Sequence, residues 1–293
     1  MKIFFALLLF VHPLSGAPKK VTIEKDVAYL AAGRKEKLDL YLPERSPGKL
    51  SPAVVIIHGG GWVGGDKGAR REIVTGTALA EAGYVGASIN YRLDAADRWP
   101  TNLHDCKNAV RWLRVNAERL QVDPARIGVI GGSAGGHLAL MVAYTAGHPA
   151  LDPGPLYQGV SDEVSACVDM YGISNLLTRQ GTDKSGKPDG KLSVKTNLFP
   201  EAAGDTPEKW KLASPVYHIG KTSPPTLILH GVRDTTVDRD QSKELLAALQ
   251  AAGVESELIM VEGANHAWSL ETADFDYTGK VVEFFDRHLK AGK

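Results

Sequence analysis

The chain has 293 residues, of which 43% are hydrophobic and 23% charged, a composition that excludes disordered, collagen-like and disulfide-scaffold proteins. Lysine plus arginine and aspartate plus glutamate number 34 each, so no net charge favours nucleic acid or an anionic membrane as a partner. The length is compatible with one globular domain that carries insertions.

The first 17 residues are typical of a signal peptide. Lys2 is followed by an apolar run at 3–11 and then by the small residues Ser15, Gly16 and Ala17. The apolar run is about half of the roughly 20 residues that a bilayer-spanning helix needs. We therefore expect a secreted or periplasmic protein without stable membrane insertion, and a single domain at 18–293.

The domain begins with strand-like segments. Residues 21–30 and 37–42 predict an antiparallel hairpin, and the unbroken apolar run at 53–57 predicts a strand that is buried on both faces. Further strands are predicted at 84–89, 127–130, 164–170, 226–229 and 257–261. Helix-like segments separate these strands, and such alternation indicates a mostly parallel sheet.

Helical periodicity predicts crossover helices at 103–115 and 241–250 and a final helix at 277–289. One apolar face of the final helix carries Val281, Phe284, Phe285 and Leu289. Residues 178–195 are rich in Gly, Lys, Asp and Ser and lack apolar periodicity. We expect an exposed loop or lid there, within an insertion at about 174–214.

Two cysteines remain, Cys106 in a helix-like segment and Cys167 in a strand-like one. An oxidising compartment would allow them to pair. Their apolar neighbours favour buried free thiols instead, and their spacing does not indicate a metal site.

A glycine-rich turn connects the strand at 127–130 to the next helix-like segment. Its sequence, GGSAG at 131–135, has the G-x-S-x-G pattern of a nucleophile elbow. Small neighbours allow the backbone to bend sharply and expose the hydroxyl of Ser133. A structural or anion-binding turn is the alternative, so the assignment of Ser133 as nucleophile depends on further motifs.

A second motif, HGGGW at 58–62, directly follows the strand at 53–57. Loops of this kind supply backbone amides that stabilise the negative oxygen of a tetrahedral intermediate. We expect the amides of Gly60, Gly61 and Ala134 to form this oxyanion hole. His58 is expected to fix the loop by hydrogen bonding rather than to act as a base.

A nucleophilic serine needs an imidazole base, and the imidazole needs a carboxylate that orients it. Asp234 follows the strand at 226–229, and His266 follows the strand at 257–261. The carboxyl ends of parallel strands meet at one edge of a sheet, and the order serine, acid, histidine is the one expected here. The sequence therefore predicts a catalytic triad of Ser133, Asp234 and His266.

Other aspartates, tryptophans and histidines lie near these motifs in the sequence. Asp238 and Asp240 are close to Asp234, but they precede a predicted helix, where negative charge complements the helix dipole. Trp62 and Trp268 flank the motifs and are candidates for the wall of a substrate pocket, with core packing as the alternative. Packing or hydrogen bonding is the expected role of four other histidines, namely His104, His137, His218 and His230.

Four separated motifs together resemble a known family. They are HGGGWVGGDK at 58–67, NYRL at 90–93, GGSAGGH at 131–137 and GANH at 263–266. Across about 35–290 the chain resembles bacterial carboxylesterases of the BD-FAE or hormone-sensitive-lipase-like group of the α/β-hydrolase superfamily. This chain has Gly132 where lipase-like relatives usually carry Asp, and it does not show their long cap before His58. Both differences favour the BD-FAE side of the resemblance.

The resemblance implies an α/β-hydrolase fold, with a mostly parallel eight-stranded sheet, an antiparallel N-terminal hairpin and helices on both faces. It also implies hydrolysis of short-acyl esters through an acyl-enzyme on Ser133, with no metal or organic cofactor. The expected substrates are small-molecule or polysaccharide-linked esters, such as acetyl or feruloyl esters of plant polysaccharides. The alternatives are an arylformamidase, a serine peptidase, or a noncatalytic binding module, against which the complete motif set argues.

Overall fold

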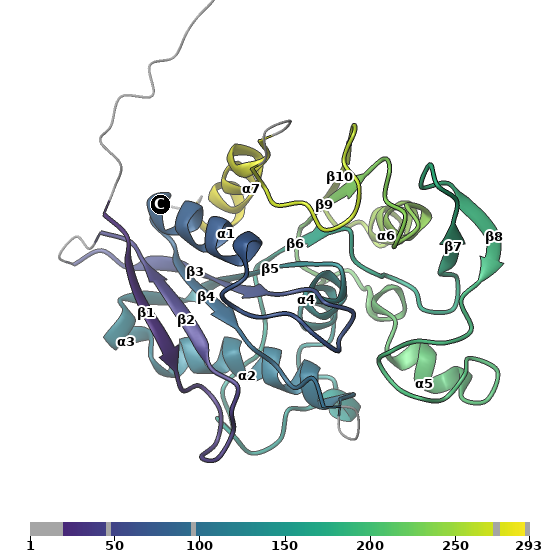
Figure 1. Cartoon of the computed structure of the whole chain (residues 1–293). Coiled ribbons are helices and arrows are strands. Elements are labelled where there is room, and N and C mark those ends of the chain that lie inside the picture. Colours follow the sequence, from purple (N-terminus) through teal and green to yellow (C-terminus); the bar gives the residue numbers. More distant parts are fainter. Residues whose placement is uncertain (1–19, 45–47, 95–97, 272–275, 291–293) are drawn as a thin grey trace, which may run out of the picture.

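A computed structural model describes residues 20–44, 48–94, 98–271 and 276–290. The predicted signal peptide at 1–17 lies outside the described residues. Eight strands of this part of the chain form one sheet in the order β1-β2-β4-β3-β5-β6-β9-β10 (Figure 1). Their bounds are β1 Thr22–Val27, β2 Leu38–Leu42, β3 Ser51–Ile57, β4 Val85–Ile89, β5 Val122–Gly132, β6 Ala166–Met170, β9 Thr226–Gly231 and β10 Ser256–Val261.

The strand directions agree with the sequence prediction. β1 pairs antiparallel with β2, and β2 pairs antiparallel with β4. Every other pairing of this sheet, from β4 through β3, β5, β6 and β9 to β10, is parallel. The carboxyl ends of the parallel strands therefore lie along one edge, where ligand sites of open α/β sheets are found.

Helices cover both faces of the sheet. The helices α1 (Arg70–Glu81) and α7 (Thr278–Phe285) pack on one face, and α2 (Thr101–Val115), α4 (Ala134–Tyr144) and α6 (Asp240–Ala251) pack on the other (Figure 1). Strand β3 shows why both faces need cover. Its residues alternate between two apolar clusters, with Val54 and Ile56 in one and Val55 and Ile57 in the other.

The insertion between β6 and β9 contains a second, two-stranded antiparallel sheet. Its strands are β7 (Gln180–Thr182) and β8 (Pro188–Leu192), and the helix α5 (Pro207–Leu212) follows. We predicted an exposed loop or lid at 178–195; most of this segment is exposed, and it forms a β-hairpin rather than an irregular loop. The hairpin escaped prediction because β7 has no apolar side chain and β8 is largely exposed, so that turn chemistry rather than apolar alternation specifies it.

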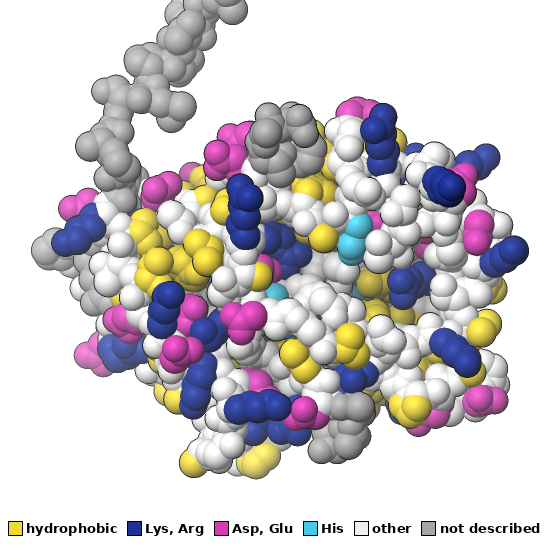
Figure 2. Space-filling model, viewed as in Figure 1, with side chains coloured by type: hydrophobic (Ala, Val, Ile, Leu, Met, Phe, Trp, Pro, Cys, Tyr) yellow, Lys and Arg dark blue, Asp and Glu magenta, His cyan; other side chains and the backbone are white. Residues whose placement is uncertain are grey.

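Shorter elements complete the fold, namely α3 (Ala117–Leu120), η1 (Pro149–Leu151), η2 (Pro215–His218) and a π-helical turn, η3 (Asp286–Lys290). Cys106 on α2 and Cys167 on β6 are both buried and free. Among the described helices, none combines the length and the apolar character needed to cross a bilayer. Acidic and basic side chains are interspersed over the face shown in Figure 2.

Candidate active site

Ser133 lies in a strained turn between β5 and α4. Its backbone angles are φ 57° and ψ −122°, which a non-glycine residue rarely adopts. A Cβ atom at Gly135 would overlap the carbonyl oxygen of Ile57, so the helix can pass this close to β3 only with glycine there. The turn places the serine side chain at the carboxyl edge of the sheet, as a nucleophile elbow requires.

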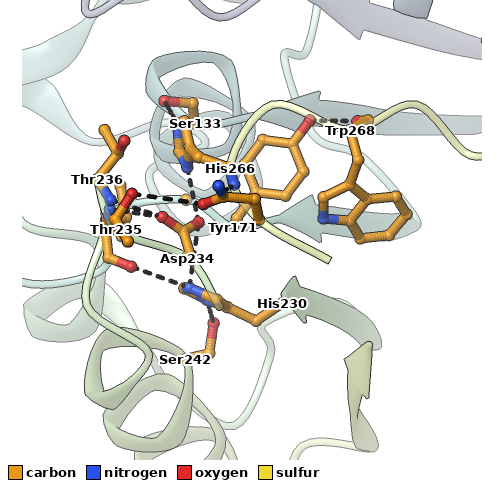
Figure 3. Close-up of polar contacts among 12 residues, drawn as sticks. Ser133, Tyr171, His230, Asp234, Thr235, Thr236, Ser242, His266 and Trp268 are labelled. Carbon is orange, nitrogen blue, oxygen red and sulfur yellow. Dashed lines mark hydrogen bonds and ion pairs between the residues drawn. The ribbon is translucent and has the colours of Figure 1, made fainter. Parts of the chain in front are cut away.

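The structure brings the three predicted triad residues together (Figure 3). His266 Nε2 accepts a hydrogen bond from Ser133 Oγ at 2.9 Å, and His266 Nδ1 donates to Asp234 Oδ2 at 2.6 Å. Asp234 is fully buried, whereas the His266 side chain is 15% exposed. This arrangement lets His266 exchange a proton with the serine while the carboxylate fixes the orientation of its ring.

The surroundings of Asp234 keep it ionised. Burial alone raises its pKa, but hydrogen bonds from His266 and from the backbone amides of Val237 and Thr236 outweigh burial, so the net pKa is lowered. The two amides donate to Asp234 Oδ1 at 2.9 Å and 2.8 Å. Asp234 is therefore an anion at neutral pH and can stabilise a positively charged His266.

A second histidine lies on the far side of Asp234, as Figure 3 shows. His230 Nε2 is 3.5 Å from Asp234 Oδ2 and 3.1 Å from the carbonyl oxygen of Val237, to which it donates. Its Nδ1 accepts from Ser242 Oγ at 2.7 Å. Burial lowers the pKa of His230, so it stays neutral and helps to hold the acid loop.

The predicted oxyanion loop follows β3 at the same edge. Gly60 and Gly61 have positive φ angles of 112° and 59°, and the carbonyl oxygen of Gly60 accepts from the amides of Val63 and Gly64. Within the described part of the chain, the amides of Gly60, Gly61 and Ala134 have no hydrogen-bond acceptor. Unpaired amides next to a serine are what an oxyanion hole requires.

His58 holds this loop rather than reaching the serine. It is buried, its Nδ1 donates to the carbonyl oxygen of Gly59 at 2.7 Å, and its ring stacks on Tyr91 with centroids 4.3 Å apart. Burial lowers its pKa to about 4, so the ring is neutral. The structure thus agrees with the loop-fixing role expected from the sequence.

The two tryptophans lie in the core. Trp62 is only 2% exposed, and its Nε1 donates to His137 Nδ1 at 3.2 Å. Trp268 is 6% exposed, and its ring packs against Tyr171 and Tyr277. These contacts agree with the core-packing alternative and leave little of either side chain to line a substrate pocket.

Two contributors to the site were missed by sequence reasoning. Tyr171 follows β6, its hydroxyl donates to the carbonyl oxygen of Trp268 at 2.6 Å, and its ring meets His266 edge-on at 5.0 Å. Arg71 Nη1 donates to the Tyr171 hydroxyl at 3.1 Å. A Cβ atom at Gly132 would overlap Arg71, so glycine there makes room for the guanidinium. The position of Tyr171, directly after a predicted strand, was the one signal available.

The strand order and the serine-centred site together define an α/β-hydrolase. Residues 38–249 match the BD-FAE family model, and the chain belongs to this family. It is 31% identical over 248 residues to esterase LipQ of Mycobacterium tuberculosis, covering 84% of this chain and 57% of LipQ. The chain spans little more than half the length of this relative and of the similarly matched esterase LipC.

Solved structures support the same fold. A truncated carbohydrate esterase from gut microbiota superposes with a TM-score of 0.77 at 27% identity, covering 92% of this chain and 96% of the other. A thermophilic esterase of Thermogutta terrifontis with bound butyrate has a TM-score of 0.71 at 26% identity, covering 93% and 94%. The fold class predicted from the sequence is thereby confirmed.

Proposed function

We propose that the chain is a serine carboxylic-ester hydrolase that forms an acyl-enzyme on Ser133. The observation that carries this proposal is the hydrogen-bond chain from Ser133 Oγ through His266 to Asp234, with distances of 2.9 Å and 2.6 Å. The unpaired amides of the oxyanion loop lie at the same edge of the sheet. Relatives and structural neighbours that carry the name esterase support the same activity.

In this mechanism Ser133 Oγ attacks the ester carbonyl while His266 Nε2 accepts its proton. The amides of Gly60, Gly61 and Ala134 donate to the oxygen that becomes negative. His266 then returns the proton to the departing alcohol, which leaves an acyl group on Ser133. Water attacks this acyl group with His266 again as base, and the carboxylic acid is released without a metal or organic cofactor.

For the substrate we propose short-acyl esters, either small molecules or esters linked to polysaccharides. One structural neighbour holds butyrate and another is named a carbohydrate esterase, which supports this choice. Acetyl or feruloyl groups on plant polysaccharides are the specific candidates. Their location outside the cell suits the export that the first 17 residues predict.

The test compares the wild type with Ser133→Ala on p-nitrophenyl acetate, butyrate and octanoate, acetylated xylan and methyl ferulate. We expect hydrolysis of the short esters by the wild type and none above background by the variant. Ser256→Ala, at the opposite end of the parallel strands, is the matched control. Cleavage of N-formylkynurenine or aminoacyl amides alone would favour a formamidase or peptidase, and failure to react with a fluorophosphonate would favour a binding module.

The acid is tested separately. Asp234→Asn should lower kcat by about 10⁴-fold, because an amide no longer holds His266 in the required tautomer. Asp240→Asn, at the start of α6, serves as control because Asp240 pairs with Lys243 and does not contact His266. A mild effect of Asp234→Asn would point to Asp238 as the acid instead.

A further inference from the structure

The turn of the β7–β8 hairpin lies against the backbone of the proposed catalytic acid. Gly186 is buried although Asp183, Ser185 and Lys187 around it are exposed. A Cβ atom at Gly186 would lie 2.7 Å from the carbonyl oxygen of Asp234 and 2.9 Å from its amide nitrogen. Side-chain carbons do not approach backbone atoms this closely, so the contact depends on glycine.

The other end of the hairpin holds the same loop by hydrogen bonds. The amide of Gln180 donates to Asp238 Oδ2 at 2.8 Å, and Arg179 Nη2 donates to the carbonyl oxygen of Thr236 at 3.2 Å. Asp238 is fully buried. The hairpin therefore contacts the loop at 233–238 at two points, through Gly186 in its turn and through Arg179 and Gln180 at its start. It also lies beside α6 (Figure 1).

The acid loop needs such support. Asp234 meets His266 at 2.6 Å, and loops at the edge of a sheet are otherwise among the more mobile parts of a protein. A misplacement of about 1 Å at a catalytic group can cost about 100-fold in rate. Apolar packing contributes little to the hairpin, because β7 carries no apolar side chain and β8 is mostly exposed. Its contacts with this loop therefore help to anchor it.

We infer that the β7–β8 hairpin is a positioning element for the catalytic acid, which acts through Gly186 and Asp238. This inference rests on the proposed function, since it assigns Asp234 its role. It differs from the lid that the sequence suggested, because opening would break the contact of Gly186 and both hydrogen bonds to the loop. The hairpin stays docked during turnover, and Gly186 and Asp238 are positioning residues.

The hairpin offers a matched pair of glycines for the test. Gly186 and Gly190 have nearly the same φ, 80° and 78°, so alanine strains the backbone equally at both. An added Cβ meets Asp234 only at position 186, because nothing lies within 4 Å at position 190. We expect Gly186→Ala to lower kcat by about 10- to 100-fold with little change in KM, and Gly190→Ala to stay within about twofold.

A second readout is independent of turnover. The proton between His266 Nδ1 and Asp234 Oδ2 should give a downfield NMR signal in the wild type and in Gly190→Ala, and Gly186→Ala should lose or broaden it. If Gly186→Ala does not fold, Asp238 supplies the test. Asp238→Ala removes the acceptor for Gln180 and should lose rate and signal, whereas Asp238→Asn keeps an oxygen there and should restore both.

Equal effects of Gly186→Ala and Gly190→Ala on kcat and on the NMR signal would overturn the inference. An Asp238→Ala variant with wild-type rate and signal would also overturn it. A wild type that lacks Ser133-dependent hydrolysis, yet shows the expected differences in the NMR signal, would remove the proposed function and keep the hairpin as the element that positions Asp234 against His266.

Discussion

Two buried aspartates at the carboxyl end of the sheet show how local contacts decide the charge of a residue. Asp234 follows β9 and accepts several hydrogen bonds, which lower its pKa. Asp169 near the end of β6 accepts from the amide of Gly172 at 3.0 Å, and its Oδ2 has no partner among the described residues. Burial therefore raises the pKa of Asp169 to about 7.

The raised pKa of Asp169 makes the stability of the fold depend on pH. In the unfolded chain this carboxyl has its ordinary pKa of 3.8, so the folded state binds the proton more tightly. The free energy of unfolding therefore falls as pH rises from about 4 to about 7. Asp169→Asn lacks this titration. When the pH is raised from 5 to 8, the free energy of unfolding of the variant should therefore increase by about 1 to 4 kcal/mol relative to that of the wild type.

Urea unfolding of both proteins at the two pH values measures this gain. Asp205→Asn, which changes an exposed carboxyl, is the control and should follow the wild type at both pH values. Parallel pH dependences of the wild type and Asp169→Asn would show that Asp169 does not titrate in this range.

At the scale of elements, Tyr171 ties the end of β6 to the loop that carries His266. Ala267 has a φ of 60°, which costs a non-glycine residue about 1 kcal/mol or more, so the loop needs a contact that holds it. The hydrogen bond from the Tyr171 hydroxyl to the carbonyl oxygen of Trp268 supplies one. The geometry of His266 thus depends on a residue from another strand.

Tyr171→Phe should lower kcat about tenfold with little change in KM. The ring and its contact with His266 remain, but the carbonyl oxygen of Trp268 and Arg71 both lose a partner, at a stability cost of about 1 to 3 kcal/mol. Steady-state kinetics on p-nitrophenyl acetate measures the effect. Tyr217→Phe is the control, because Tyr217 is 51% exposed. Wild-type kcat in Tyr171→Phe would exclude a role of the hydroxyl in positioning His266.

The elements that were predictable from sequence are those with a strong apolar pattern. The run at 53–57 reads as a strand buried on both faces, and the stripe of Val281, Phe284 and Phe285 reads as a packed helix; both are confirmed. The β7–β8 hairpin has no such pattern. The helix-like segment expected after GGSAG is α4, and it begins at Ala134 because the strained turn at Ser133 leads directly into it.

For the whole molecule, a parallel sheet gathers the ends of distant segments at one edge, and this rule made Ser133, Asp234 and His266 predictable. The residues that hold them were not predictable, because they act through close approach and backbone hydrogen bonds that leave no motif. Asp238 illustrates this point. We assigned it to the start of a helix, whereas its carboxylate accepts from Gln180 of the hairpin.

In the same architecture, some residues that stabilise the core lie far from the active site at the carboxyl edge of the sheet. Helix α7 docks on the face of the sheet through Phe285, which is fully buried; its ring carbon Cε1 would lie 2.8 Å from a Cβ at Gly128, in the middle of β5. Phe285→Ala leaves a cavity there and should lower the free energy of unfolding by about 3 to 5 kcal/mol.

Urea unfolding measures this loss, and Ile73→Ala on α1, where the side chain is 42% exposed, should stay within about 0.5 kcal/mol of the wild type. Because Gly128 lies away from the carboxyl edge, kcat per folded molecule of Phe285→Ala should match the wild type well below its melting temperature. A lowered kcat under those conditions would mean that the packing of α7 is transmitted along β5 to the turn at Ser133, so that core and site are coupled.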